Sequence, residues 1–191
     1  AEILRKASFM PGKRNKNGVQ KNARAEIKKL TDFAMAARKN NDCSDQTCGL
    51  FYKVKAGKME YCFNRQTGVF DSIKCSGSEL LKKPLKFNFM RAPTDNDSMR
   101  RQWFNEHLND YDTKVYASRI KKDGEQTIIT AELSFEWNRH QPFLYGRVIW
   151  TITKDGGLCV NFDFNATSKL FMLPRIGLRF FLDKGFDTVE Y

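Results

Sequence analysis

Apolar residues in the second half of the chain recur at every second position, which is the period of a strand with one buried face. Within 126–137, Ile129, Ala131, Leu133, Phe135 and Trp137 point one way, and Thr130, Glu132, Ser134 and Glu136 point the other. This alternation predicts a half-buried antiparallel strand over Gln126–Trp137. We expect the carboxylates of Glu132 and Glu136 to lie on its solvated face.

The clearest hairpin joins Arg147–Lys154 to Leu158–Ala166 through the turn Asp155-Gly156-Gly157. Further strands are expected over Phe51–Val54, Met59–Phe63, Val69–Cys75, Lys114–Lys121 and Arg175–Leu182. One helix is expected at Ser98–Tyr111, where Phe104, Leu108 and Tyr111 share a face. The 16 Phe residues can fill a sizeable core, so the pattern predicts an all-β sandwich.

The stretch Asp187–Tyr191 reads as a strand in progress. A sheet that stopped there would leave an unpaired edge. We therefore expect the sandwich to be incomplete, either because further sequence completes it or because the domain is an excerpt.

Residues 1–48 differ from the rest and are expected to form a separate basic segment ahead of a sandwich domain at 49–191. They hold 11 Lys/Arg and 5 Asp/Glu, so they carry +6 of the total net charge of +11. Pro11–Gly18 reads as a charged linker, and Asn22–Lys39 as a helix with Ile27, Leu30, Ala34 and Ala37 on one side. This helical appendage either packs lightly on the sandwich or connects two domains.

The cysteines and the hydropathy narrow the class of protein. Five cysteines at loose spacing are a poor disulfide framework, although Cys43 and Cys48 are close enough to bridge locally. Free thiols in a reducing compartment are the favoured reading. No run of apolar residues approaches the roughly 18 needed to span a membrane, and the N-terminus lacks a signal-like apolar region.

A search for catalytic groups finds none. Glu132 and Glu136 lie about 13 Å apart along a strand, whereas glycosidase carboxyl pairs are separated by about 5 to 9.5 Å. The two histidines, His107 and His140, have no Asp, Glu or Cys at ligand spacing. Nucleophile elbows and phosphate-binding loops are also absent. The chain is therefore expected to hold no catalytic residue and no metal site.

The richest polar cluster is Arg91-Ala92-Pro93-Thr94-Asp95-Asn96-Asp97. The oxygens of Asp95, Asn96 and Asp97 can accept hydrogen bonds from sugar hydroxyls, hold a hard cation or cap the next helix. Arg91 can bind one of the carboxylates in a bidentate manner. A structured turn with a cap is the simpler interpretation.

The same cluster carries a resemblance to a known family. R-A-P-x-D-N-D resembles a hallmark of the large bacterial β-galactosidases of glycoside hydrolase family 2. Phe63–Gly68 resembles the F-N-R-Q-x-G hairpin of their fifth domain, and Pro174–Leu178 is similar to their P-R-I-G-L strand. These segments, in this order, extend the resemblance over roughly residues 50–191. Residues 1–10 can match the tail of a preceding domain, and 11–48 have no counterpart in the resemblance.

The resemblance implies a fold and a parent activity. The fold is the antiparallel supersandwich shared with galactose mutarotases, of which this chain would hold the N-terminal part. The parent would hydrolyse terminal β-D-galactosides with retention, using glutamates on a barrel domain with magnesium and sodium nearby. None of those positions falls in this chain, so the fragment alone is expected to be inactive and to need no cofactor.

Partners and site residues follow from the same resemblance. The partners would be the galactoside, the remaining domains and, in a homo-oligomer, further copies; neither a membrane nor nucleic acid is expected. Arg91, Asp95, Asn96 and Asp97 become candidates for a substrate-facing or interdomain loop. Trp103, Trp137 and Trp150 should not inherit the active-site role of the family's late tryptophan.

Two alternatives remain open. Residues 1–48 can act as a basic module for nucleic acid or another polyanion, although their charge is more simply a solvated surface. An aldose epimerase is suggested by the shared fold, but its chemistry needs a general acid and base, usually a His and a Glu, in one cleft.

Overall fold

The computed structural model describes residues 19–39, 49–105, 108–137, 141–167, 172–183, 185, 186 and 188. Within these residues, two helices and ten strands follow one another as α1 (Val19–Lys39), β1 (Phe51–Ala56), β2 (Met59–Asn64), β3 (Val69–Cys75), β4 (Ser78–Glu79), β5 (Leu81–Asn88), α2 (Arg100–Asn105), β6 (Tyr111–Asp123), β7 (Gln126–Trp137), β8 (Leu144–Ile152), β9 (Leu158–Ala166) and β10 (Gly177–Leu182). His107, His140, Cys43 and Cys48 lie outside these residues, so the predictions made for them stay predictions.

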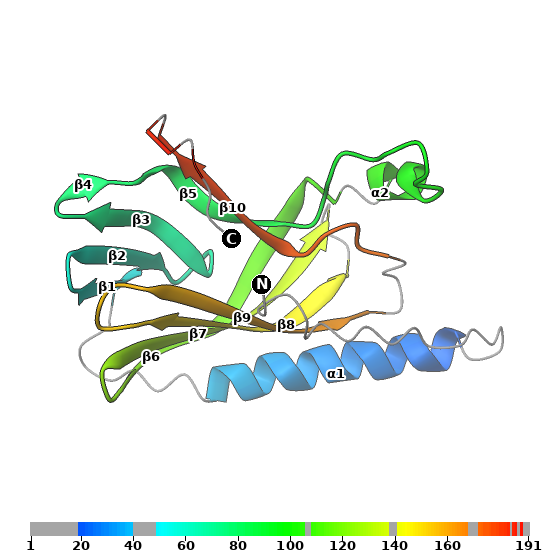
Figure 1. Cartoon of the computed structure of the whole chain (residues 1–191). Helices are drawn as coiled ribbons and strands as arrows, with labels where there is room; N and C mark the ends of the chain where they lie inside the picture. Colours follow the sequence, from blue (N-terminus) through cyan, green and yellow to red (C-terminus); the bar gives the residue numbers. More distant parts are fainter. Residues whose placement is uncertain are drawn as a thin grey trace.

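All strand pairs are antiparallel and form three sheets. The sheet β6-β7-β8-β9 makes one layer, and β1-β2-β3-β4 with the pair β10-β5 makes the layer that faces it (Figure 1). Aromatic side chains from both layers meet in the core, including Phe70 against Trp150 and Phe87 against Phe135, with ring centroids 5.0 and 4.8 Å apart. The prediction of an all-β sandwich with a helical N-terminal appendage is confirmed.

The turn between β2 and β3 ties the two layers together. Asn64 shapes it, because its side chain accepts a hydrogen bond from the Gln66 N–H (2.9 Å) and donates one to Asp71 (2.8 Å). Gly68 ends the turn at φ +74° and touches the opposite layer, since a Cβ there would lie 2.9 Å from Leu133 Cδ2. The indole Nε1–H of Trp150 donates to the Gly68 carbonyl oxygen across the core (3.2 Å).

The long strand β7 matches its predicted bounds, and its apolar face is buried as expected. The prediction of a solvated opposite face is wrong for Glu132 and Ser134, which are both buried. Arg119 and Arg147 each donate to Glu132 Oε1, at 3.0 and 3.4 Å. This pairing offsets the cost of removing the carboxylate from water.

Helix α1 runs along that outer face, on the side of the sheet away from β10 (Figure 1). Phe33 lies edge-on to both Tyr116 and Tyr145, with ring centroids 5.8 and 5.7 Å apart. The predicted apolar side is wrong at Ile27, which is 45% exposed. The ring contacts to the sheet come instead from Phe33, which was not part of the predicted apolar side. The helix therefore packs on the sandwich through a narrow stripe.

Around the R-A-P segment, one prediction is wrong and one strand was not predicted. The helix predicted at Ser98–Tyr111 is limited to α2, since Tyr111 already begins β6 and Phe104 is 54% exposed. Trp103 of α2 is buried. An unpredicted strand, β5, precedes the segment, and it alternates poorly because Lys82, Lys83 and Pro84 are all exposed.

Neither described helix has the length and apolar character needed to cross a lipid bilayer. Cys62, Cys75 and Cys159 are free thiols. Burial raises the pKa of the Cys62 thiol above its ordinary value, which keeps it protonated and unreactive at neutral pH.

Candidate functional site

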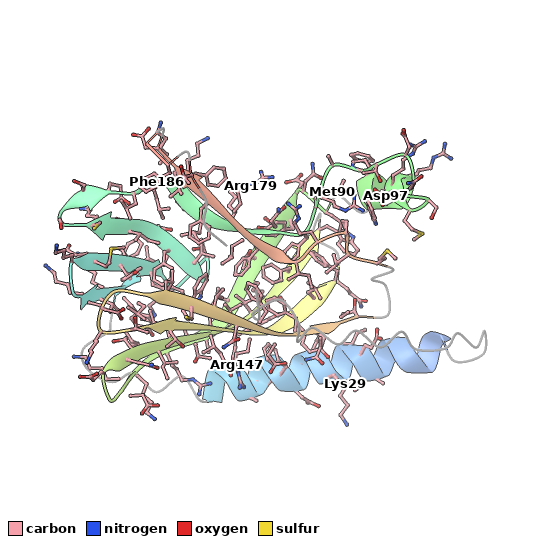
Figure 2. The ribbon with its side chains drawn as sticks, viewed as in Figure 1. Lys29, Met90, Asp97, Arg147, Arg179 and Phe186 are labelled. Carbon is pink, nitrogen blue, oxygen red and sulfur yellow. The ribbon has the colours of Figure 1, made fainter. Side chains whose placement is uncertain are left out.

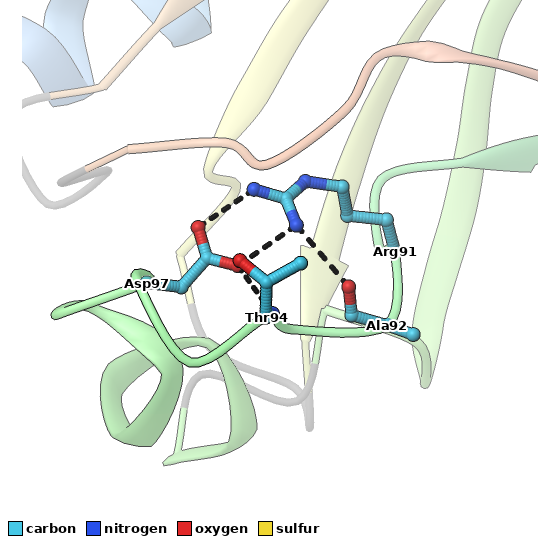
Figure 3. A network of polar contacts seen from close by, with 4 residues as sticks. All are labelled: Arg91, Ala92, Thr94 and Asp97. Atoms are coloured by element: carbon cyan, nitrogen blue, oxygen red, sulfur yellow. Dashed lines mark hydrogen bonds and ion pairs between the residues drawn. The ribbon is translucent and has the colours of Figure 1, made fainter.

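The polar cluster at 91–97 forms a closed loop between β5 and α2 (Figures 2 and 3). Arg91 binds Asp97 with two parallel hydrogen bonds, Nη2 to Oδ1 at 2.7 Å and Nη1 to Oδ2 at 2.8 Å. Charge-assisted pairs of this bidentate form are among the stronger polar contacts in proteins. The predicted bidentate contact is therefore present, and Asp97 is its acceptor.

Asp97 also closes a turn with Thr94. Its Oδ2 accepts the Thr94 N–H at 2.6 Å and the Thr94 hydroxyl at 3.0 Å, while its own N–H donates to the Thr94 carbonyl oxygen at 3.1 Å. The carboxylate of Asp97 thus holds the backbone of the loop at Thr94. The interpretation of this segment as a structured turn fits these contacts.

Arg91 joins the loop to α2 as well. Its guanidinium Cζ lies 5.2 Å from the ring centroid of the buried Trp103, within the range of a cation–π contact. Its Nη1 also donates to the Ala92 carbonyl oxygen at 3.2 Å. One side chain therefore fixes both ends of the loop and the helix that follows it.

The other two candidates, Asp95 and Asn96, lie at the exposed tip of the loop. The side chain of Asp95 is fully exposed and is 3.8 Å from Arg100 Nη1. The four candidates therefore separate into two kinds: Arg91 and Asp97 shape the loop, and Asp95 with Asn96 present oxygens outward. The outward pair is available to a ligand or to another domain.

A cleft of about 1110 Å³ lies beside the loop. Of the four candidates only Arg91 lines it; the rest of its wall comes from β5, β10, the β2–β3 turn with its flanking residues, the loop itself, α2 and the segment that begins β6. Its polar groups include Asn64, Asp71 and Arg179, which the sequence pattern did not single out as site residues. Arg179 lies more than 100 residues along the chain from Asn64 and Asp71, so spacing could not have revealed the group.

Tyr111 contributes a neutral hydroxyl to the cleft wall. It donates to the Phe87 carbonyl oxygen at 2.5 Å, and burial raises its pKa to about 12. Around it the wall offers hydrogen-bonding groups and aromatic surface such as Phe104 and Phe181. Within the described residues, no group of three or more His, Cys, Asp or Glu side chains is placed to hold a metal ion.

The Asp97 carboxyl is expected to make stability depend on pH. The Arg91 guanidinium and the Thr94 N–H lower its pKa from 3.8 to about 2. Because the folded-state pKa is lowered, the stabilisation is present above pH 4 and is lost as the pH falls from about 4 to 2. In urea unfolding, Asp97→Asn should be less stable than the parent at pH 6, and this difference should shrink below pH 4.

Glu60→Gln is the matched control, because the pKa of Glu60 is lowered by an exposed lysine, Lys55. Such surface pairs stabilise little, so this variant should follow the parent at every pH. A carboxyl of Asp97 that titrates near pH 4 in an NMR titration would contradict the assignment.

Comparison with known proteins connects these features to a family. A family model described as the beta galactosidase small chain matches residues 55–191. A β-galactosidase of Actinobacillus pleuropneumoniae is 31% identical over 139 residues, which are 72% of this chain and 14% of that protein. One from Staphylococcus xylosus is 29% identical over 162 residues, covering 81% of this chain and 16% of that protein.

The chain therefore spans only about a sixth of the length of the curated relatives it matches. The matched residues contain every strand from β2 to β10, the loop at 91–97 and the cleft, whereas α1 lies outside them. With more than half of its residues matched, the chain belongs to the β-galactosidase small-chain family.

Proposed function

We propose that this chain is an accessory sandwich domain of a β-galactosidase of glycoside hydrolase family 2. The parent enzyme would hydrolyse terminal β-D-galactosides with retention of configuration. The observation that carries the proposal is the family match over 55–191, with the R-A-P-T-D-N-D segment folded into one closed loop. The chain contributes fold, an assembly surface and one wall of the sugar pocket.

The loop is the part of the domain best suited to meet the rest of the enzyme. Arg91 and Asp97 hold its shape, so the tip bearing Asp95 and Asn96 loses little conformational entropy on binding. Carboxylate and amide oxygens accept hydrogen bonds from sugar hydroxyls or from backbone N–H groups. The tip therefore borders the pocket or the neighbouring domain.

The catalytic carboxylates belong to the remainder of the enzyme in this proposal. Within the described part of the chain, the buried Glu132 is held by two arginines and Asp97 by a third. Both carboxylates are therefore engaged in structural ion pairs rather than held for proton transfer or nucleophilic attack. Magnesium and sodium, which the family resemblance implies for the parent, would likewise be held by its other domains.

A chimera tests the proposal. Residues 55–191 of this chain replace the matched 139-residue segment of the Actinobacillus pleuropneumoniae enzyme, and hydrolysis of a chromogenic β-galactoside is measured. The same enzyme with the segment deleted, and this chain by itself, are the two controls. We expect activity from the chimera and none from either control.

The alternatives give different results. A chimera that is folded by circular dichroism and has the parent's assembly state, yet cleaves no galactoside, would refute the proposal. Activity from the chain alone would place catalytic carboxylates within it.

A further inference from the structure

Three cationic side chains that line the cleft have no counter-ion among the described residues. They are Lys86 of β5, Arg179 of β10 and Arg175, which precedes β10, and all three are exposed. The fourth cation of the lining, Arg91, is already paired with Asp97. None of the other three forms an ion pair with a described acidic residue, so their charges are available to a ligand.

Two of these cations lie next to each other. Arg179 is directly opposite Lys86 in the β10–β5 register, and side chains at opposed positions point to the same face of a sheet, with Cβ atoms about 5 Å apart. Like charges in this arrangement destabilise the sheet. A negative group bound between the two side chains would remove the repulsion and gain charge-assisted hydrogen bonds from both.

The charge of Arg179 also acts on the wall that begins β6. Burial raises the pKa of Tyr111 to about 12, and the positive charge of Arg179 opposes this rise. Asp110 and Asp112 flank Tyr111 in the sequence and line the same cleft, and neither forms an ion pair with a described basic residue. One cleft therefore presents both positive and negative groups that are not paired with each other.

These opposite charges narrow the chemistry of the ligand. A bare anion would be repelled by the carboxylates of Asp110 and Asp112, and a neutral sugar would leave the charges of Lys86 and Arg179 facing each other. Hydroxyl groups, by contrast, donate hydrogen bonds to carboxylates. A ligand that carries both a negative group and hydroxyls satisfies both sets of side chains.

The rest of the lining and the volume of the cleft fit a sugar ring. Asn64 donates to Asp71 at 2.8 Å, and this pair offers further hydrogen-bonding capacity. Phe104 and Phe181 add aromatic surface, and ligand sites combine such surface with a few polar groups that fix the orientation of the ligand. A volume of about 1110 Å³ is ample for a single hexose.

We propose that the cleft binds an anionic hexose, either a hexose phosphate or a hexuronate. Its negative group lies between Arg179 and Lys86, and its hydroxyls donate to Asp110 and Asp112. The site is on the side of the molecule opposite α1, where Figure 2 shows two of its lining residues, Met90 and Arg179. The inference goes beyond the proposed function and does not depend on it, since the galactoside of the parent enzyme carries no negative group.

Titration calorimetry of the chain with four probes tests the inference. The probes are galactose 6-phosphate, galacturonate, galactose and inorganic phosphate. At least one of the two acidic sugars should bind about tenfold or more tightly than both galactose and inorganic phosphate, because each of the latter offers only one of the two sets of contacts. The acidic sugar that binds more tightly shows whether the negative group is a phosphate or a carboxylate.

Variants of the two opposed cations test where the negative group lies. Arg179→Gln and Lys86→Gln should each weaken binding of the acidic sugar at least about tenfold, since a hydrogen bond to a charged group is lost. Their thermal midpoints should not fall below the parent's, because each change removes the repulsion between the opposed charges. Lys122→Gln is the matched control and should bind like the parent, because Lys122 is an exposed lysine of β6 that does not line the cleft.

Several results would overturn the inference. Neither acidic sugar binds; inorganic phosphate binds as tightly as the acidic sugar, which shows an adventitious ion only; galactose binds as tightly; or Arg179→Gln binds like the parent. The β-galactosidase chimera should retain the affinity for the acidic sugar, and a folded chimera without it would show that the remaining polypeptide fills the cleft. Galactoside cleavage by the chimera tests the proposed function separately, so an inactive chimera that binds the acidic sugar leaves the inference standing.

Discussion

Replacing Gly146 with alanine is expected to destabilise the sandwich by about 3 kcal/mol. Gly146 lies in β8 beside β9, and a Cβ built on it would be 2.1 Å from the Asp163 carbonyl oxygen and 2.9 Å from Phe164 Cα. Both neighbours are backbone atoms of a paired strand, so they cannot move aside without breaking the β8–β9 register. The thermal midpoint, followed by circular dichroism, should fall by about 6 to 12 °C.

Gly177→Ala is the control, because Gly177 also lies in a strand but has no atom within 4 Å of an added Cβ. Its midpoint should stay within about 2 °C of the parent's. Equal midpoints for Gly146→Ala and the parent would show that β9 does not pass as close to β8 as described.

Strand positions could be predicted where a local pattern coincides with the final environment. The limits of β7 and β9 were predicted to the residue, because each has alternating apolar residues and a glycine-containing turn beside it. Strand β5 was missed for the opposite reason. Its exposed run Lys82-Lys83-Pro84 interrupts the alternation, and its place beside β10 depends on a pairing across nearly a hundred residues.

The errors on the outer face of β7 have a tertiary cause. The alternation of apolar and polar residues along a strand predicts which residues face the core. It does not predict whether a second element covers the other face. Helix α1 lies there through Phe33, and two arginines from neighbouring strands bury Glu132. The polar residues Glu132 and Ser134 therefore looked solvated in sequence and are buried in the fold.

The candidate site was predictable only where its residues lie close together in the sequence. Arg91 and the loop carboxylates lie within six residues of one another, so a bidentate contact of Arg91 with one of them followed from residue types and spacing; the structure shows that the partner is Asp97. The cleft beside them was not predictable, since Asn64, Asp71 and Arg179 approach it from three separate strands or their ends. Only the register of the sheets brings these side chains together.

Trp150→Ala is expected to have the largest effect of any single change considered, about 3 to 5 kcal/mol. Trp150 is fully buried and packs edge-on against Phe70 of the opposite layer, with ring centroids 5.0 Å apart. Removing the indole leaves a cavity between the layers and takes the hydrogen bond from the Gly68 carbonyl oxygen. The urea midpoint should fall accordingly, and the β2–β3 turn should lose its protection from hydrogen exchange.

One further variant separates the packing of Trp150 from its hydrogen bond, and a second is a control for the loss of an aromatic ring. Trp150→Phe retains most of the packing but not the N–H donor, so it should lose about 1 to 3 kcal/mol, the cost of an unpaired buried carbonyl. Phe104→Ala removes an aromatic ring that is 54% exposed and should stay within about 0.5 kcal/mol of the parent. If Trp150→Ala were no worse than Phe104→Ala, Trp150 would not join the layers. The F-N-R-Q-x-G turn would then need another reason to lie against β8.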